Sequence, residues 1–308
     1  MGLWEKYAEG NRTEMGASLW HNGGHISLDR LGEARLAQCF AIWTPEAYRG
    51  ADALAFYRAA RDWFHQHVDA EADHLARPAN VADADAILDE GRAVGLLTVE
   101  GGGPVGQDLA VIDEMAADGV RMFTLTWNGP NAIASGHDTH EGISAFGRTA
   151  VARLEEKGIV IDVSHLNDEG FWDLAKIARK PFVASHSNAR AVCSHLRNLT
   201  DSQFEAIRDA GGVVGINYCV FFLRDGGTTQ DVTFDDLSRH VDHLLSLGGE
   251  DVLALGSDYD GSTVPAWLDG CENLAPFYHQ FAARFGEDLA KKVFYTNARD
   301  FFVRYQQL

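Results

Sequence analysis

The sequence predicts an α/β fold built on a parallel β-sheet. Short apolar runs rich in Val, Ile and Leu recur along the chain, and a segment with helical spacing follows each of them. Apolar runs of roughly four to eight residues separated by helices are typical of parallel strands that are covered on both faces. Because no repeat, low-complexity stretch or Pro/Gly-rich linker divides the chain, we expect residues 1–308 to form one domain.

The strands are expected, in chain order, at 37–43, 95–100, 121–127, 158–165, 181–186, 211–219 and 251–257. Helical spacing is clearest at 146–157 and 235–247. An open sheet tolerates an odd number of strands, whereas a (β/α)8 barrel needs eight. Most of the runs end in a polar or reactive side chain, namely Glu100, Trp127-Asn128, His165, His186, Asn217-Tyr218 and Asp258.

These polar strand ends favour the barrel. In a barrel the carboxyl ends of all strands converge on one rim, whereas in an open sheet they are spread along a line. We therefore predict a (β/α)8, TIM-like barrel that lacks its first strand, which would lie ahead of Leu3. A gap should then separate the strand ending near Trp43 from the one ending near Ser257.

Charge and cysteine content exclude several classes of protein. The chain carries 26 Lys and Arg against 45 Asp and Glu, a formal net charge of −19, which repels phosphate backbones and anionic lipids. Neither a nucleic acid nor a membrane surface is therefore expected as a partner. No apolar run is long enough to span a bilayer, and residues 1–7 lack a signal-peptide pattern. The four cysteines form no CxxC pair, which is typical of reduced thiols in a cytoplasmic protein.

The segments IDVSH and ASHSN place His165 and His186 at the ends of adjacent predicted strands. A single histidine at such a position is more often structural, but two on neighbouring parallel strands can reach one zinc ion. Glu100 is followed by three glycines. Taken without the histidines, it would be interpreted as a solvated carboxylate in a turn. Together with the two histidines it is a candidate metal ligand. Asp162 lies inside an apolar strand, where a carboxylate is costly unless something binds it.

The segment GSDYDG places Asp258 and Asp260 just beyond the last predicted strand. A carboxylate near a metal-activated water can deprotonate it, so Asp258 is the candidate catalytic residue, and Asp260 is expected to cap a turn. Arg197, in the loop after His186, suits bidentate capture of a carboxylate.

The other histidines carry weaker signals. His240 and His243 lie three residues apart on a predicted helix and are expected to face solvent. His137 and His140 lie in a polar loop that could overhang the strand ends.

The motifs VIDVSH, ASHSNARAVC and LGSDYDG, in this order, resemble those of the membrane (renal-type) dipeptidases, a family of zinc metallopeptidases. The resemblance runs from about residues 38–41 to 297–299. It implies a TIM barrel with two zinc ions, in which Glu100 bridges the metals and His165 and His186 bind the second one. It also implies that Asp258 positions the attacking water and that Arg197 holds the C-terminal carboxylate of a dipeptide.

Two departures from the family pattern affect these expectations. The family opens with a strand ending in a His-x-Asp pair that binds the first zinc, and no such pair precedes Leu3; His25 falls in a connecting segment. The substrate-polarising histidine of the family falls on Trp127, so Asn128 and Tyr218 are taken as candidate substrate contacts. With Glu100, His165 and His186 alone, one zinc is expected instead of two.

The leading hypothesis is a zinc dipeptidase that acts on dipeptides with a free C-terminal carboxylate; C-terminal D-residues and a homodimer are left open. A degenerate single-metal or non-catalytic paralogue is the first alternative, because the His-x-Asp pair is absent, unless the sequence starts at an internal methionine. A deacylase acting on N-acyl amino acids is the second alternative.

Overall fold

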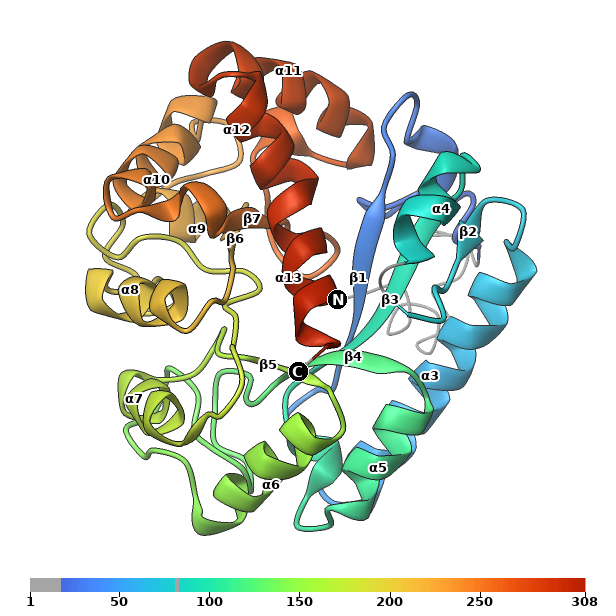
Figure 1. Cartoon of the computed structure of the whole chain (residues 1–308), viewed down its shortest axis with the longest axis vertical. Helices are drawn as coiled ribbons and strands as arrows, with labels where there is room; N and C mark the ends of the chain where they lie inside the picture. Colours follow the sequence, from blue (N-terminus) through green and yellow to red (C-terminus); the bar gives the residue numbers. More distant parts are fainter. Residues whose placement is uncertain (1–17, 81–82, 308) are drawn as a thin grey trace.

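The computed structural model describes residues 18–80 and 83–307. The strands are β1 Ala37–Trp43, β2 Leu75–Ala76, β3 Ala93–Glu100, β4 Val120–Thr124, β5 Val160–Asp162, β6 Val214–Asn217 and β7 Leu253–Gly256. The α-helices are α3 Ala51–Ala70, α4 Ala84–Asp89, α5 Ala110–Ala117, α6 Ala145–Glu156, α7 Asp168–Ile177, α8 Asp201–Asp209, α9 Val220–Leu223, α10 Phe234–Ser246, α11 Leu274–Phe285, α12 Glu287–Lys291 and α13 Asn297–Tyr305. Most helices form an outer ring around the strands (Figure 1).

The strands form a continuous parallel arrangement from β1 to β7. One sheet has the order β1-β3-β4-β5, and β6 pairs with β7. Single parallel bridges, Asp162 with Val183 and Ala184 with Val214, link the two sheets. The strand expected at 181–186 is therefore reduced to two bridging residues. β2 was not predicted, because only two of its residues pair with the start of β3.

Local sequence explains why the main elements form where they do. β3 is buried on both faces along almost its whole length, as its unbroken apolar run predicted. α6 begins after Ser144, whose hydroxyl accepts a hydrogen bond from the amide of Gly147 at 2.8 Å. α10 begins after Thr233, which forms a capping box with Asp236. Both helices lie within one residue of the predicted ranges.

A gap was expected between β1 and β7. Within residues 18–80 and 83–307 no ladder pairs these two strands. A cavity of about 1610 Å³ lies along both of them and extends to the carboxyl ends of the strands. At the opposite end α13 packs Phe301 and Tyr305 against Val160 and Val213, and so closes that end of the barrel. The strand expected ahead of Leu3 falls outside the described residues.

The expectation that His240 faces solvent is wrong. This side chain is fully buried; its Nδ1 accepts a hydrogen bond from the amide of Ala189 at 3.1 Å, and its Nε2 donates to the carbonyl of Leu223 at 2.9 Å. The position follows Leu237 by three residues and precedes Leu244 by four, so it belongs to the apolar face of α10. His243 is partly exposed and pairs with Asp201 at 2.7 Å.

His240 should make the stability of the protein depend on pH. Burial lowers the pKa of His240 to about 4, whereas an unfolded histidine titrates near its ordinary value of about 6.5. The unfolded chain therefore binds more protons between these values, and stability should fall by about 3 kcal/mol from this residue as pH drops from 6.5 to 4. Denaturant unfolding of His240→Gln at a series of pH values should show a free energy of unfolding that falls less steeply toward acid pH. The control is His140→Gln, at an exposed position, which should keep the wild-type slope. Equal slopes for the wild type and both variants would contradict this assignment.

Candidate active site

Glu100, His165 and His186 converge at the carboxyl ends of the strands. Glu100 ends β3, His165 lies three residues beyond β5, and His186 follows the bridge at Ala184. Their ligand atoms all lie within 4.8 Å of one another. Oε1 of Glu100 is 2.7 Å from Nε2 of His165 and 3.7 Å from Nε2 of His186, and the side chains are only 9 to 15% exposed. The geometry matches the predicted metal triad; its function as a ligand set stays a prediction.

The carboxylate of Asp162 holds these strand ends together. Its carboxylate accepts hydrogen bonds from the hydroxyl of Thr124, the amide of Ser164, and the amide and hydroxyl of Ser185. Burial by itself would raise the pKa of Asp162, but the nearby His186 and these donors hold it below its ordinary value. The buried carboxylate therefore ties β4 and β5 to the segment that carries His186.

His165 lies outside the strand that was expected to extend over residues 158–165. β5 ends at Asp162, and His165 has a φ of 72°, in the left-handed region that side chains other than glycine rarely adopt. Such a backbone is costly and is often found at functional sites. Here it turns the imidazole toward Glu100 and His186.

Hydrogen bonds fix both imidazoles in the same tautomer. Nδ1 of His165 lies 3.0 Å from the amide oxygen of Asn128, which can only accept, so Nδ1 carries the proton. Ser185 gives its hydroxyl proton to Asp162 and accepts from Nδ1 of His186 at 2.6 Å. Both Nε2 atoms therefore present lone pairs, and they face each other at 3.0 Å.

This donor set fits a divalent metal ion. Burial lowers the pKa of His165 and of His186, so both rings are neutral near pH 7. Two facing lone pairs and a carboxylate repel one another unless a cation lies among them. Neutral imidazoles whose second nitrogen is held by a hydrogen bond are the usual form of histidine ligands.

Asp258 lies beside the triad in the same cavity. Its Oδ2 accepts a hydrogen bond from the side-chain amide of Asn217 at 3.1 Å. Burial raises the pKa of Asp258, and His186 lowers it only in part. Asp258 follows β7 with a φ of 56°, so its backbone, like that of His165, lies in the left-handed region.

Arg197 is a buried cation in the wall of the cavity. It is 4% exposed, and within the ranges that the structure covers it forms no ion pair with a carboxylate. Its guanidinium lies over the ring of Phe222 at 5.4 Å, and Nη2 lies 3.5 Å from the carbonyl of His186. A buried guanidinium without a carboxylate is costly, which favours an anionic ligand for this position.

Residues 1–301 match the family described as Membrane dipeptidase (Peptidase family M19). The chain belongs to this family. The predicted resemblance is therefore confirmed, and so is its consequence that the protein is a metallopeptidase hydrolase of dipeptidase type.

Similar proteins agree with this membership. A protein of Klebsiella pneumoniae, described as an uncharacterized protein in the pqqA 5′ region, is 42% identical over 185 residues, 57% of this chain and 68% of that protein. The crystal structure of dipeptidase AC, a metallopeptidase of family M19, matches with a TM-score of 0.92 at 29% identity, over 98% of this chain and 96% of that chain. A metallopeptidase from Rhodobacter sphaeroides, liganded with a phosphinate mimic of the dipeptide L-Ala-D-Ala, matches equally well at 28% identity and the same coverage. The predicted barrel fold is confirmed by these matches.

The two predicted substrate contacts, Asn128 and Tyr218, have different surroundings in the structure. The amide oxygen of Asn128 is occupied by His165, so only its amide nitrogen could reach a substrate. Tyr218 lines the cavity but is fully buried, and its hydroxyl lacks a hydrogen-bond partner among the residues that the structure describes. A substrate contact of either residue stays a prediction.

Sequence reasoning gave too little weight to two histidines at the cavity wall. The ring of His137 is 6.1 Å from those of His165 and His195, and burial lowers the pKa of His137 to about 4. His195 accepts a hydrogen bond from the amide of Arg197 at 3.1 Å and lies 4.6 Å from the ring of Phe222. The sequence HLR, which places His195 two residues before Arg197, was the available signal.

The described part of the chain contains no helix with the length and apolar character that a membrane crossing requires.

Proposed function

We propose that this chain hydrolyses dipeptides with a free C-terminal carboxylate, using zinc held by Glu100, His165 and His186. The observation that carries the proposal is that one cavity contains both the buried triad and Arg197, a buried cation without a carboxylate partner in the described structure. A dipeptide brings a scissile carbonyl to the first feature and a carboxylate to the second.

The ligand atoms of the triad suit zinc. Zinc binds imidazole nitrogen and carboxylate oxygen, and a set of three protein ligands leaves a position for water or substrate. When bound, the ion would polarise the scissile carbonyl and acidify a water molecule. Asn128 and Ser185 orient the two histidines through Nδ1, which keeps both Nε2 atoms available.

Asp258 is proposed to handle the proton. Its carboxylate lies in the same cavity as the triad and is oriented by Asn217, while burial raises its pKa above that of an ordinary aspartate. A more basic carboxylate is better suited to take the proton of the attacking water and to return it to the leaving amine nitrogen.

Arg197 is proposed to bind the C-terminal carboxylate. The planar guanidinium can form two parallel hydrogen bonds with it, and Phe222 holds the group in place. The relative from Rhodobacter sphaeroides binds a mimic of L-Ala-D-Ala. This similarity supports acceptance of a C-terminal D-residue here.

Replacing Arg197 with methionine should raise KM for dipeptides about 100-fold and should affect C-terminally amidated dipeptides far less. The amidated substrates lack the charge that the guanidinium recognises, so they lose little when it is removed. Steady-state kinetics on matched free and amidated substrates would check this. Arg284→Met is the control, because Arg284 forms an exposed ion pair with Asp242 and does not line the cavity. An equal loss for both substrate forms in Arg197→Met would contradict the assignment.

A substrate screen separates dipeptide hydrolysis from deacylation. Dipeptides and N-acyl amino acids share the C-terminal carboxylate, so Arg197 serves both, but only dipeptides carry a free α-amino group. Turnover of N-acyl amino acids without turnover of dipeptides would replace the proposed substrate class.

A further inference from the structure

We propose that His25 is a positioning residue for Asp258, which it holds through a reciprocal clamp with Asp260. The inference rests on the proposed function, because it takes Asp258 as the group that handles the proton. His25 lies far from Asp258 in the sequence, on the segment that precedes β1, and the clamp joins that segment to the turn after β7.

Three hydrogen bonds form the clamp. The backbone amide of Asp260 donates to Nδ1 of His25 at 2.8 Å. In return, the carboxylate of Asp260 accepts from the backbone amides of His25 at 2.7 Å and of Ile26 at 3.3 Å. Each partner thus uses both its backbone and its side chain, so the two segments are fixed in distance and in orientation.

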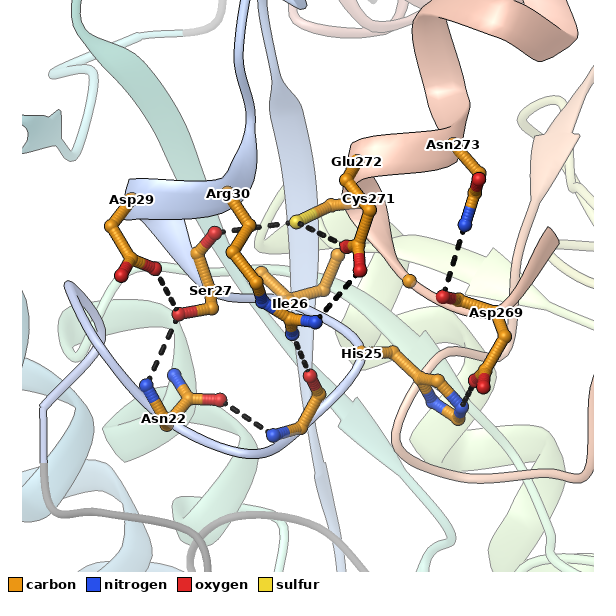
Figure 2. Close-up of polar contacts among 12 residues, drawn as sticks. Asn22, His25, Ile26, Ser27, Asp29, Arg30, Asp269, Cys271, Glu272 and Asn273 are labelled. Atoms are coloured by element: carbon orange, nitrogen blue, oxygen red, sulfur yellow. Dashed lines mark hydrogen bonds and ion pairs between the residues drawn. The ribbon is translucent and has the colours of Figure 1, made fainter.

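The imidazole of His25 is itself held on two further sides. Because Nδ1 accepts a hydrogen bond, Nε2 carries the proton, and it lies 3.1 Å from the carboxylate of Asp269 (Figure 2). The ring also lies 5.2 Å from the ring of Tyr259. His25 is thereby fixed against the turn that contains Asp258, Tyr259 and Asp260.

That turn needs external support, because its backbone is strained. Asp258 and Asp260 have φ values of 56° and 63°, and side chains other than glycine stay in this region only when their surroundings hold them there. The carbonyl of Asp258 accepts hydrogen bonds from the amides of Gly261 and Ser262. These local bonds fix the turn internally, and the clamp fixes Asp260 against the segment that precedes β1. If Asp260 relaxed, the carboxylate of Asp258 would change direction.

The close approach of the two segments depends on Gly24. A Cβ atom at this position would lie 2.6 Å from Oδ1 of Asp260, the oxygen that accepts from the amide of His25. Only glycine lets the backbone come near enough for the clamp to close.

The segment that carries His25 is anchored without the imidazole. Leu19, Ile26 and Leu28 are buried in the core. The carbonyl of His25 accepts a hydrogen bond from the amide of Cys271 at 2.9 Å. Arg30 pairs with Glu272 at 2.9 Å (Figure 2). Truncating the side chain of His25 should therefore leave the segment in place, with its two backbone donors to the carboxylate of Asp260, while it removes the hydrogen bond that the imidazole accepts from the amide of Asp260.

The experiment compares His25→Ala, His25→Asn and Glu272→Gln in the metal-loaded full chain. His25→Ala should lower kcat about 10- to 100-fold, the cost of displacing a catalytic group by about 1 Å, and leave KM for a dipeptide within about twofold. His25→Asn should restore most of kcat, because the asparagine oxygen can accept from the amide of Asp260 in place of Nδ1. Glu272→Gln removes an exposed ion pair of the same segment, so kcat should stay unchanged and Tm should shift by at most about 2 °C.

A second readout does not depend on turnover. A phosphinate dipeptide analogue resembles the tetrahedral arrangement of the reaction, so its affinity should fall in His25→Ala in parallel with kcat, whereas KM for the substrate should not change.

The proposed positioning role of His25 is overturned if His25→Ala keeps kcat within twofold of the wild type. It is also overturned if His25→Asn loses as much kcat as His25→Ala. A loss of kcat in Glu272→Gln that equals the loss in His25→Ala would show a structural effect of the segment and would also overturn it. Asp258→Asn separates this failure from that of the proposed function. If Asp258→Asn is fully active, the proton role of Asp258 is wrong; if Asp258→Asn is inactive while His25→Ala is normal, only the clamp is wrong.

Discussion

Replacing His186 with alanine should remove the metal from the triad and lower kcat for dipeptides by roughly 10³-fold or more, while the chain stays folded. The imidazole is one of the three proposed ligands, and Glu100 and His165 alone would offer too few donors to hold an ion against water. Its ring faces the cavity, so its loss removes little core packing. Metal analysis after dialysis, together with a dipeptide hydrolysis assay and a thermal melt, would test all three statements.

Two controls make this result specific. His140→Ala removes an exposed histidine outside the cavity lining and should leave metal content and activity unchanged. Wild-type protein treated with a chelator should lose activity and regain it when zinc is added back. Near-normal activity in metal-depleted His186→Ala would eliminate the proposed mechanism.

Replacing Asp258 with asparagine should lower kcat about 10²- to 10⁴-fold without removing the metal. The amide has the shape of the carboxylate but cannot accept a proton, whereas the ligands of the triad are untouched. Steady-state kinetics and metal analysis on the same preparation would separate this result from that of His186→Ala.

The two outcomes for Asp258→Asn have distinct meanings. Retained metal with lost turnover supports a proton role. Lost metal with lost turnover would place Asp258 among the metal ligands, and unchanged turnover would exclude it from the chemistry.

The strand and helix pattern could be predicted closely from the sequence. The range 37–43 matches β1 residue for residue, and the helices expected at 146–157 and 235–247 are displaced by one residue. These elements are fixed by local apolar spacing and by caps, which the sequence displays directly. β2 and the weak strand at 181–186 depend on pairing partners, so their extent could not be predicted in the same way.

Histidines show how far side-chain burial can be predicted. His165 and His186 were found because the ends of parallel strands meet on one rim, a rule that needs only the order of the strands. His240 was placed in solvent because it lies on a helix remote from the predicted rim. Its actual partners come from α9 and from the loop at Ala189, which the sequence does not reveal.

The sequence by itself determined which side chains stand at the strand ends, since a strand ends where its apolar run ends. It thereby indicated the triad and the two charged residues near it, Asp258 and Arg197. Only the tertiary structure decided how these groups are held: Asn128 and Ser185 set the tautomers of the histidines, Asp162 joins three segments, and His25 clamps the turn of Asp258. The physical reason is that a hydrogen bond depends on distance and direction to within fractions of an ångström and a few tens of degrees. Between residues as far apart in the chain as His25 and Asp260, that geometry is set by the packing of the whole barrel and not by any local pattern of residues.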